Sequence, residues 1–240
     1  MRKFLILLCI PAIFSVSCRE IFGKRVRGDG KINSDSRSVG SFSSVEVGGA
    51  IDLYVKQDAS QSVKIEADGN LLEYIDIYTE GDKLVVRTKN GFNLKPSRDI
   101  KVSVSAPLFK KIEASGACDV FTENQLVSNE NVSIDLSGAC DAKMDIKAPS
   151  VEADISGACS VQLKGETKNL KAGGSGSVGF KCFDMLAENV SVDISGAGDA
   201  EVYASQKLDV DVSGAAGVKY KGNATVNQHV SGAGSVKKVE

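Results

Sequence analysis

Ser195-Gly196-Ala197-Gly198-Asp199 is the clearest copy of a short phrase that recurs through the second half of this 240-residue chain. Copies that open with Ser-Gly-Ala start at Ser115, Ser137, Ser156, Ser213 and Ser231, and a degenerate copy is assigned a start at Gly173. The seven starts are separated by 17 to 22 residues. A unit of about 20 residues repeated this often predicts a solenoid, because one such unit cannot bury its own apolar face.

Side chains before each phrase alternate in polarity, as expected for half-buried strands. The positions one and three residues before the phrase are almost all apolar, for example Leu136 and Ile134. The position between them is polar, and its occupants are Glu113, Asp135, Asp154, Lys171, Asp193, Asp211 and His229. Each strand is expected to pair with the same strand of the next repeat, about 4.8 Å away. The fold class that follows is all-β, with a right-handed parallel β-helix of about seven coils over residues 107–240.

The start of the chain reads as an export signal over residues 1–17. Arg2 and Lys3 precede an apolar run, Phe4–Phe14, that is too short to cross a bilayer. Cys18 follows small residues and is typical of a lipoprotein signal, in which this cysteine carries the lipid. An ordinary secretory signal with a coincidental cysteine is the alternative.

Two further segments precede the repeats. Residues 18–41 are polar and lack periodicity, so we expect a flexible tether. Residues 42–106 contain short stretches rich in Val, Ile, Tyr and Thr, separated by turn residues, and are predicted to form a β-rich N-terminal part.

Composition excludes several classes of function. The formal net charge of −2 argues against a nucleic-acid binder, which needs a basic surface. His229 is the only histidine, which argues against histidine-based metal sites and acid–base pairs. The sequence contains no P-loop, no dinucleotide-binding glycine pattern and no nucleophile elbow. No cofactor and no metal are therefore expected.

Cys118, Cys140 and Cys159 occupy the same position in three consecutive copies of the phrase. At a spacing of about 4.8 Å, two neighbouring cysteines could form a disulfide between coils. The alternative is that cysteine serves as a small, buried, soft apolar residue. A structural zinc site needs four convergent ligands, which a straight ladder does not supply. Cys182 lies outside the column.

The carboxylates of the polar column are a candidate ligand or cation face: Glu113, Asp135, Asp154, Asp193 and Asp211. Carboxylates on next-but-one rungs could also reach the separation of about 5–10 Å that glycoside hydrolysis requires. The low aromatic content of 6% and the absence of Trp supply no platform for sugar rings. A solvated face that discourages sideways sheet pairing is the simpler interpretation, and no catalytic residue is assigned.

The repeated phrases, the strands of pattern V-x-I/V-D-I/V-S before them and the leader that begins Phe42-Ser43-Ser44-Val45-Glu46 resemble the head GIN domain family. This is a family of auto-transporter adhesin heads, common among exported proteins and lipoproteins of Bacteroidetes. The likeness covers residues 42–238 and departs from the family pattern where cysteine replaces glycine in three copies. It implies a similar solenoid and supplies no catalytic or binding residues to transfer.

The predicted function is that of an exported cell-envelope lipoprotein, an adhesin or surface binding module without catalysis. It would be anchored in the outer membrane on the periplasmic or the surface face, with a glycan or a surface protein as its partner. The alternatives are a periplasmic scaffold and a polysaccharide-active enzyme. The terminal coil near residue 235 exposes a strand edge, so we expect either the 42–106 segment to cover it or another subunit to dock there.

Overall fold

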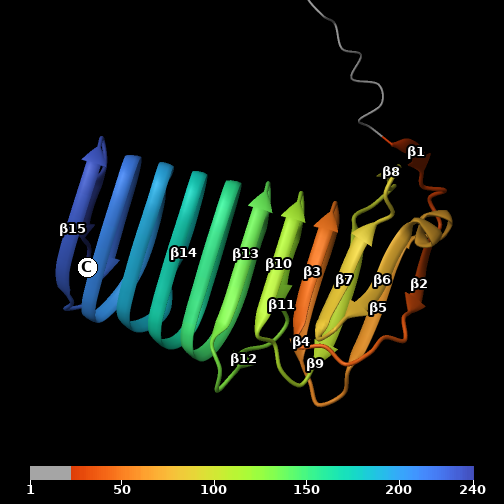
Figure 1. Ribbon diagram of the computed structural model, residues 1–240, viewed down its shortest axis with the longest axis horizontal. Coiled ribbons are helices and arrows are strands. Elements are labelled where there is room, and N and C mark those ends of the chain that lie inside the picture. The colour runs from red at the N-terminus through yellow and green to blue at the C-terminus, as the bar shows by residue number, and fades with distance from the viewer. Residues whose placement is uncertain (1–22) are drawn as a thin grey trace, which may run out of the picture.

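The computed structural model describes residues 23–240, which form an all-β molecule (Figure 1). A sheet of 14 strands contains most of these residues, and a separate two-stranded sheet joins β1 (Lys24–Arg27) to β8 (Phe92–Lys95). The one helical element in the described range is a 3-10 turn, η1 (Gly69–Tyr74). The predicted all-β class is confirmed. The signal over residues 1–17 and the lipid site at Cys18 lie outside the described residues.

The large sheet is mixed, although the strand pairs within the predicted repeat region, residues 107–240, are parallel. Its strands are β2 (Ile32–Ser36), β3 (Ser44–Gly49), β4 (Ile51–Gln57), β5 (Ser62–Asp68), β6 (Ile75–Glu80), β7 (Lys83–Thr88), β9 (Ile100–Ala106), β10 (Lys111–Gly116), β11 (Asp119–Thr122), β12 (Leu126–Val127), β13 (Val132–Gly138), β14 (Asp141–Lys221), β15 (Thr225–Gly232) and β16 (Ser235–Lys238). The pairs β2–β5, β5–β9 and β6–β7 are antiparallel, and the other pairings between these strands are parallel. All three antiparallel pairs lie in the N-terminal region.

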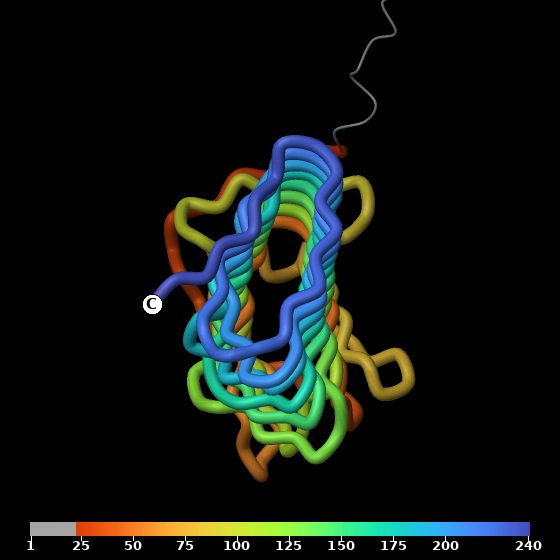
Figure 2. The backbone as a smooth tube through the Cα atoms, turned by 90° about the vertical axis from the view of Figure 1, so that its left-hand side faces the viewer, coloured from red at the N-terminus to blue at the C-terminus, as the bar shows by residue number. Residues whose placement is uncertain are grey.

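The repeats pair with one another in register. Glu113 on β10 lies opposite Asp135 on β13, and Asp135 lies opposite Asp154 on β14. The chain of β14 is extended for 81 residues, so it must bend repeatedly to stay within the molecule. Figure 2, which looks along the long axis, shows successive passes of the chain lying over one another. The period in the sequence is thus one pass around the molecule.

A column of glycines explains where the chain bends. Gly116, Gly138 and Gly157 have φ of 108°, 98° and 95°, and the equivalent glycines of the later copies are also positive. Such angles lie in a region that side chains with a Cβ rarely adopt. A Cβ on Gly138 would in addition overlap the carbonyl oxygen of Gly116 in the preceding pass. Glycine is therefore required at this corner for two reasons: its backbone angle is positive, and the preceding pass lies too close for a side chain.

The same column corrects the phase of the fourth copy. Gly176 has φ of 101° and stacks on Gly157, so the copy begins at Ser175 and not at Gly173. Gly173 instead lies beside Asp154, in the polar column where Lys171 was expected. The error arose because Gly173-Gly174 imitates the start of the phrase, while only stacking shows which glycine makes the corner.

The predicted apolar columns are buried, which confirms the alternation. Ile112, Ile134, Leu136, Val192, Ile194 and Val212 are at most 2% exposed. The interior is filled mainly by Val, Ile, Leu and Ala, with Phe109 and Phe180 as its largest fully buried side chains. Burying a Val, Leu or Ile side chain contributes about 1.5–3 kcal/mol, so the stacked columns supply most of the driving force for folding.

The N-terminal region joins the same sheet and does not form a separate layer. β3 pairs in register with β10, so that Gly49 stands in the glycine column and Glu46 in the polar column. β7 and β9 pair with β3 and β4 on the side away from the repeats. The pass over residues 44–57 therefore lies between a later pass, residues 83–106, and the first repeat.

The structure corrects one expectation about the ends and excludes one of the two alternatives for the C-terminal coil. Within the predicted tether 18–41, β1 and β2 form strands that pair with β8 and β5, because backbone hydrogen bonds need no hydrophobic period. The segment 42–106 does not cover the C-terminal coil, since it lies at the opposite end of the molecule (Figure 1). In the described chain, β15 and β16 pair only with β14.

Candidate functional site

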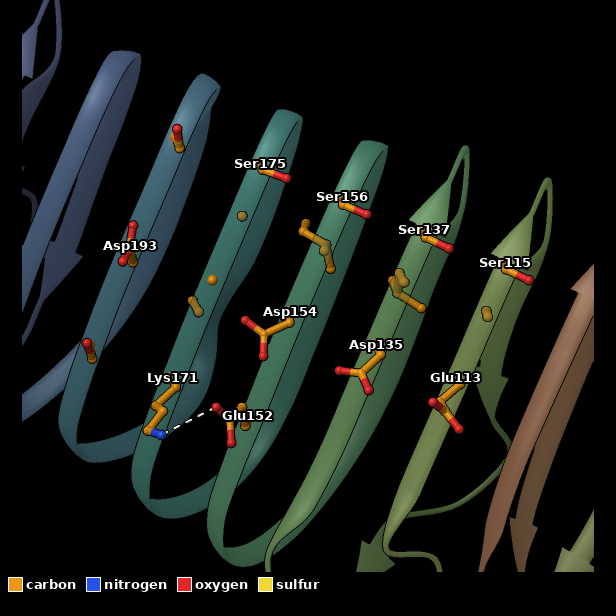
Figure 3. Close-up of a pocket in the computed structure, with 18 of the residues that line it drawn as sticks. Glu113, Ser115, Asp135, Ser137, Glu152, Asp154, Ser156, Lys171, Ser175 and Asp193 are labelled. Carbon is orange, nitrogen blue, oxygen red and sulfur yellow. Dashed lines mark hydrogen bonds and ion pairs between the residues drawn. The ribbon is translucent and has the colours of Figure 1, made fainter. Parts of the chain in front are cut away.

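An open groove of about 1010 Å³ runs across the polar column on the face formed by β3, β10, β13 and the passes of β14. Figure 3 shows its carboxylates on successive strands, with a row of serines above them. Three of the predicted face residues, Glu113, Asp135 and Asp154, lie side by side, and Asp193 lies two passes beyond Asp154. Asp211 belongs to the same column but is not among the groove residues.

Sequence reasoning missed several groove residues. Glu46 extends the column by one pass toward the N-terminus because β3 is in register with β10. Glu152 lines the edge of the groove two positions before Asp154, and Lys171, which was expected within the polar column, lies beside it two positions before Gly173. The signal for Glu46 was present in the leader, where Val45-Glu46-Val47-Gly48-Gly49 repeats the strand-and-corner pattern.

The two halves of the groove differ in charge. In the N-terminal half, Lys83 forms ion pairs with Glu46 and Glu113. Lys111 forms ion pairs with Glu113 at 2.9 Å and with Asp135 at 2.7 Å. These carboxylates raise the pKa of Lys111 well above its ordinary value. Two lysines thus offset most of the charge of three carboxylates, and this half keeps a net charge of −1.

The second half is anionic. Lys171 pairs with Glu152 at 3.3 Å, and no ion pair within 4.0 Å reaches Asp154 or Asp193 from residues 23–240. Partial burial, together with the negative charges of Glu152 and Asp135, raises the pKa of Asp154. A carboxyl group whose pKa is shifted by partial burial and by neighbouring charges is typical of functional sites.

Gly173 opens a notch in the carboxylate column. A Cβ at this position would overlap Oδ1 of Asp154, so the carboxyl group leans into the space that a side chain would occupy. Asp154 and Asp193 are thus separated by a pass that carries no side chain in the column. The notch therefore interrupts the row of polar side chains between Asp154 and Asp193.

A row of serine hydroxyls borders the carboxylates. Ser115, Ser137, Ser156, Ser175 and Ser195 are the first residues of their phrases and line the groove. The register Ser115–Ser137–Ser156 places their hydroxyls at the spacing of adjacent strands. Each hydroxyl both donates and accepts hydrogen bonds, so the row complements the acceptor-only carboxylates.

The groove is suited to polar recognition. Within residues 23–240, no group of three or more His, Cys, Asp or Glu side chains is placed to hold a metal ion. The aromatic pair Tyr54–Phe121 stacks at 5.2 Å on strands β4 and β11, outside the groove. Hydroxyl-rich or cationic ligands match the groups that the groove presents.

The cysteine column is structural in character. Cys118, Cys140, Cys159 and Cys182 are free thiols and are buried. The thiols of Cys118, Cys140 and Cys159 each donate to a carbonyl oxygen three residues earlier, at 3.3 Å. Burial raises the pKa of Cys118 to about 11 and that of Cys182 to about 12. The structure favours the interpretation of small apolar residues over a disulfide.

The fold is similar to solved structures of bacterial proteins. A "putative adhesin" from Bacteroides fragilis aligns with a TM-score of 0.85 at 20% identity, over 89% of this chain and 100% of the other. A "putative lipid binding protein" from Parabacteroides distasonis aligns with a TM-score of 0.77 at 20% identity, over 90% and 100%. A "putative adhesin" from Parabacteroides merdae gives 0.70 at 22%, over 91% and 100%. At these identities the likeness shows the fold alone.

Three further comparisons and observations concern the family to which this chain belongs. No curated protein matches the sequence. Among residues 23–240, no helix has the length and apolar character needed to cross a membrane. The family model described as "Putative auto-transporter adhesin, head GIN domain" matches residues 41–224, most of the chain. This match agrees with the resemblance of the repeated phrases and of the leader, and the chain belongs to the head GIN domain family.

Proposed function

We propose that this protein is a non-catalytic binding module of the cell envelope, exported and anchored by a lipid on Cys18. In this proposal the passes of the chain wind as a right-handed parallel β-helix that presents the groove as its binding face. The ligand is a hydroxyl-rich or amine-bearing molecule, a glycan in the first instance and a surface protein as the alternative. Membership of a family of adhesin heads supports a surface-binding role.

The observation that carries the proposal is the in-register ladder of carboxylates and hydroxyls. Residues from six passes, between Glu46 and Asp193, contribute to one open groove. A groove this long and open offers many weak polar contacts to an extended chain. Polymers and surface chains fit this shape.

The same geometry argues against the enzyme alternative. Cleavage of a glycosidic bond needs one carboxyl group with a raised pKa facing a second, ionised one across the scissile bond. Here the carboxylates that line the groove come from successive strands of one face and form a single column. Loss of turnover of a polysaccharide on Asp154→Asn would restore the enzyme as a candidate.

Binding is tested with an array of immobilised glycans that includes amine-bearing polymers. The purified protein is compared with Asp154→Asn, in the anionic half of the groove, and with Asp184→Asn, an exposed aspartate outside it. We expect Asp154→Asn to weaken binding about tenfold, the loss of one charge-assisted contact, and Asp184→Asn to have no effect. Equal binding by all three proteins would contradict the assignment of the groove.

Localisation is tested by protease digestion on intact cells, with lysed cells as the control. Digestion on intact cells would support an outward-facing binding module. Protection until lysis would contradict the adhesin role and favour the periplasmic scaffold. Metabolic labelling with a radioactive fatty acid, compared between the natural protein and Cys18→Ser, tests the anchor separately.

A further inference from the structure

We propose that the end of the molecule formed by β1, β8 and the loops after them is a docking surface for an anionic lipid headgroup layer. This inference rests on the proposed lipid anchor at Cys18, and it adds an orientation: the N-terminal end faces the membrane. The groove, which lies on the passes further along the chain, is then held away from the lipid surface.

The first observation is a concentration of positive charge. Residues 23–31 and 95–99 carry six cations and two carboxylates, Asp29 and Asp99, for a net charge of +4, whereas the whole chain carries −2. The cations are Lys24, Arg25, Arg27, Lys31, Lys95 and Arg98, and all six are exposed. We call this set the basic end.

The second observation is that these cations lack protein partners. Among residues 23–240, none of the six cations lies within 4.0 Å of a carboxylate. By contrast, eleven other lysines of this range form at least one such ion pair, for example Lys147–Glu166 and Lys219–Glu201. Arg27 and Lys95 stand directly opposite each other in the register of β1 and β8. Like charges opposite each other destabilise a strand pair, and an external anionic surface would relieve this repulsion.

The third observation is that a buried aspartate holds the basic end together. Asp68 is fully buried and accepts hydrogen bonds from the backbone N–H of Gly30 at 2.7 Å and of Ser97 at 2.8 Å, and from the Ser97 hydroxyl at 2.7 Å. It therefore ties the loop after β1 to the loop after β8. Ile32, one of three well-exposed large apolar side chains among residues 23–240, is 40% exposed and lines a surface hollow together with Arg98. An apolar side chain beside cations suits the headgroup boundary.

The position of Cys18 identifies a lipid layer as the occupant. Six residue steps separate Cys18 from Lys24, and even a fully extended chain of that length spans only about 21 Å. A lipid on Cys18 would therefore keep the basic end close to the headgroups. Each Lys or Arg near an anionic membrane surface strengthens binding about fivefold, so several exposed cations form an effective second contact.

The test uses the full chain with Cys18→Ser, so that no lipid is attached and any binding comes from the protein surface. Cosedimentation is measured with vesicles of phosphatidylcholine alone and of phosphatidylcholine with phosphatidylglycerol, at low and high salt. The patch variant adds Arg25→Glu, Arg27→Glu and Lys95→Glu. A matched control reverses three lysines near the other end: Lys221→Glu, Lys237→Glu and Lys238→Glu. Residues 1–17 contribute the same background to every protein.

We expect the parent and the control to bind phosphatidylglycerol vesicles more tightly than neutral ones, with the difference lost at high salt. The patch variant should bind the anionic vesicles at least about a hundredfold more weakly than the parent. Equal binding by the patch variant, or no preference of the parent for anionic vesicles, would overturn the proposal. Retention on immobilised heparin without vesicle binding would assign the basic end to a soluble polyanion instead.

Folding of each variant is checked by circular dichroism and thermal melting. If the charge reversals unfold the protein, Arg25→Gln, Arg27→Gln and Lys95→Gln replace them, with a weaker but still measurable loss expected. Failure of the anchor is distinguishable: without fatty-acid labelling of Cys18 the proposed anchoring fails, while vesicle binding still reports on the basic end.

Discussion

Residues 42–106 and residues 107–240 build the same kind of strand and the same glycine corner, but they connect their strands differently. In the repeats, neighbours in the sheet are neighbours in the chain, and each pass pairs with the one about 20 residues earlier. In the N-terminal region, β3 and β4 lie between β7 and β9 on one side and β10 and β11 on the other. In this region the order of the strands along the chain therefore differs from their order in the sheet.

The difference shows how one end of the large sheet is completed. A terminal pass leaves an edge of unpaired backbone groups, which promotes association with other strands. Here the antiparallel strands β5 and β6 add to β9 and β7, and η1 places Leu71 in a buried position. The same region carries the basic end. Regular repetition thus builds the groove, and irregular connection builds the end that closes it.

The largest effect is expected from Gly138→Ala in the repeats. The new Cβ would overlap the Gly116 carbonyl, which also accepts a hydrogen bond from the Ala139 N–H at 2.7 Å. We expect a loss of about 4 kcal/mol or more in the free energy of unfolding, or no folding at all. Gly81→Ala is the matched control in the N-terminal region: φ is 62° but no atom lies within 4 Å, so only the backbone strain of about 1 kcal/mol applies. If Gly138→Ala and Gly81→Ala lost similar amounts of stability, contact with the neighbouring pass would not be the reason for glycine at the corner.

The second-largest effect is expected from Asp68→Ala, which removes the hydrogen bonds that join two loops of the N-terminal region. Burial by itself would raise the pKa of Asp68, but hydrogen bonds from Ser97 and Gly30 stabilise the ionised carboxylate and hold the pKa below its ordinary value. We expect a loss of about 3 kcal/mol at neutral pH. Because the folded-state pKa is lowered, this contribution is present above the ordinary pKa of about 3.9 and is lost as pH falls through the lowered value.

Denaturant unfolding measured across the acid range checks this prediction. The natural protein should lose stability as pH falls below about 4, and Asp68→Ala should lose less over the same range. Asp184→Ala, an exposed aspartate, serves as the control and should change neither the stability nor its pH dependence. A pH profile of Asp68→Ala parallel to that of the natural protein would rule out this role.

A smaller effect compares two adjacent passes. Val212 and Val230 are register partners, but Val212 is fully buried and Val230 is only half-buried. Val212→Ala should cost about 2 kcal/mol and Val230→Ala less than about 1 kcal/mol. Another subunit docked on this coil, as predicted for the terminal edge, would raise the second value and make it depend on protein concentration. Light scattering of the natural protein measures that association directly.

The smallest effect concerns the cysteines. Cys140→Ala should lower the free energy of unfolding by about 1 kcal/mol, the cost of a small buried group. A reducing agent should leave the melting temperature of the natural protein unchanged, because the thiols are free. Cys182→Ala is the control for loss of a buried thiol that lies outside the cysteine column. A melting temperature that falls on reduction would instead support a disulfide between neighbouring coils.

The sequence by itself determined the period, the all-β class and the faces of the strands. Alternation is a local property: Ile134 and Leu136 are apolar and Asp135 between them is polar, so a single strand already shows which side is buried. The carboxylates Glu113, Asp135, Asp154 and Asp193 could be aligned for the same reason. Family membership followed from the same repeated phrases.

Only the tertiary structure decided which strands are neighbours. Backbone hydrogen bonds across a sheet are nearly the same for every residue, so the sequence of β3 does not state that β7 and β10 flank it. Stacking of Gly176 on Gly157 moved Gly173 into the polar column and opened the notch beside Asp154. The pairing of β1 with β8, and the buried Asp68, gathered cations from distant segments into the basic end. These features depend on contacts between residues far apart in the chain, which alternation along one strand does not encode.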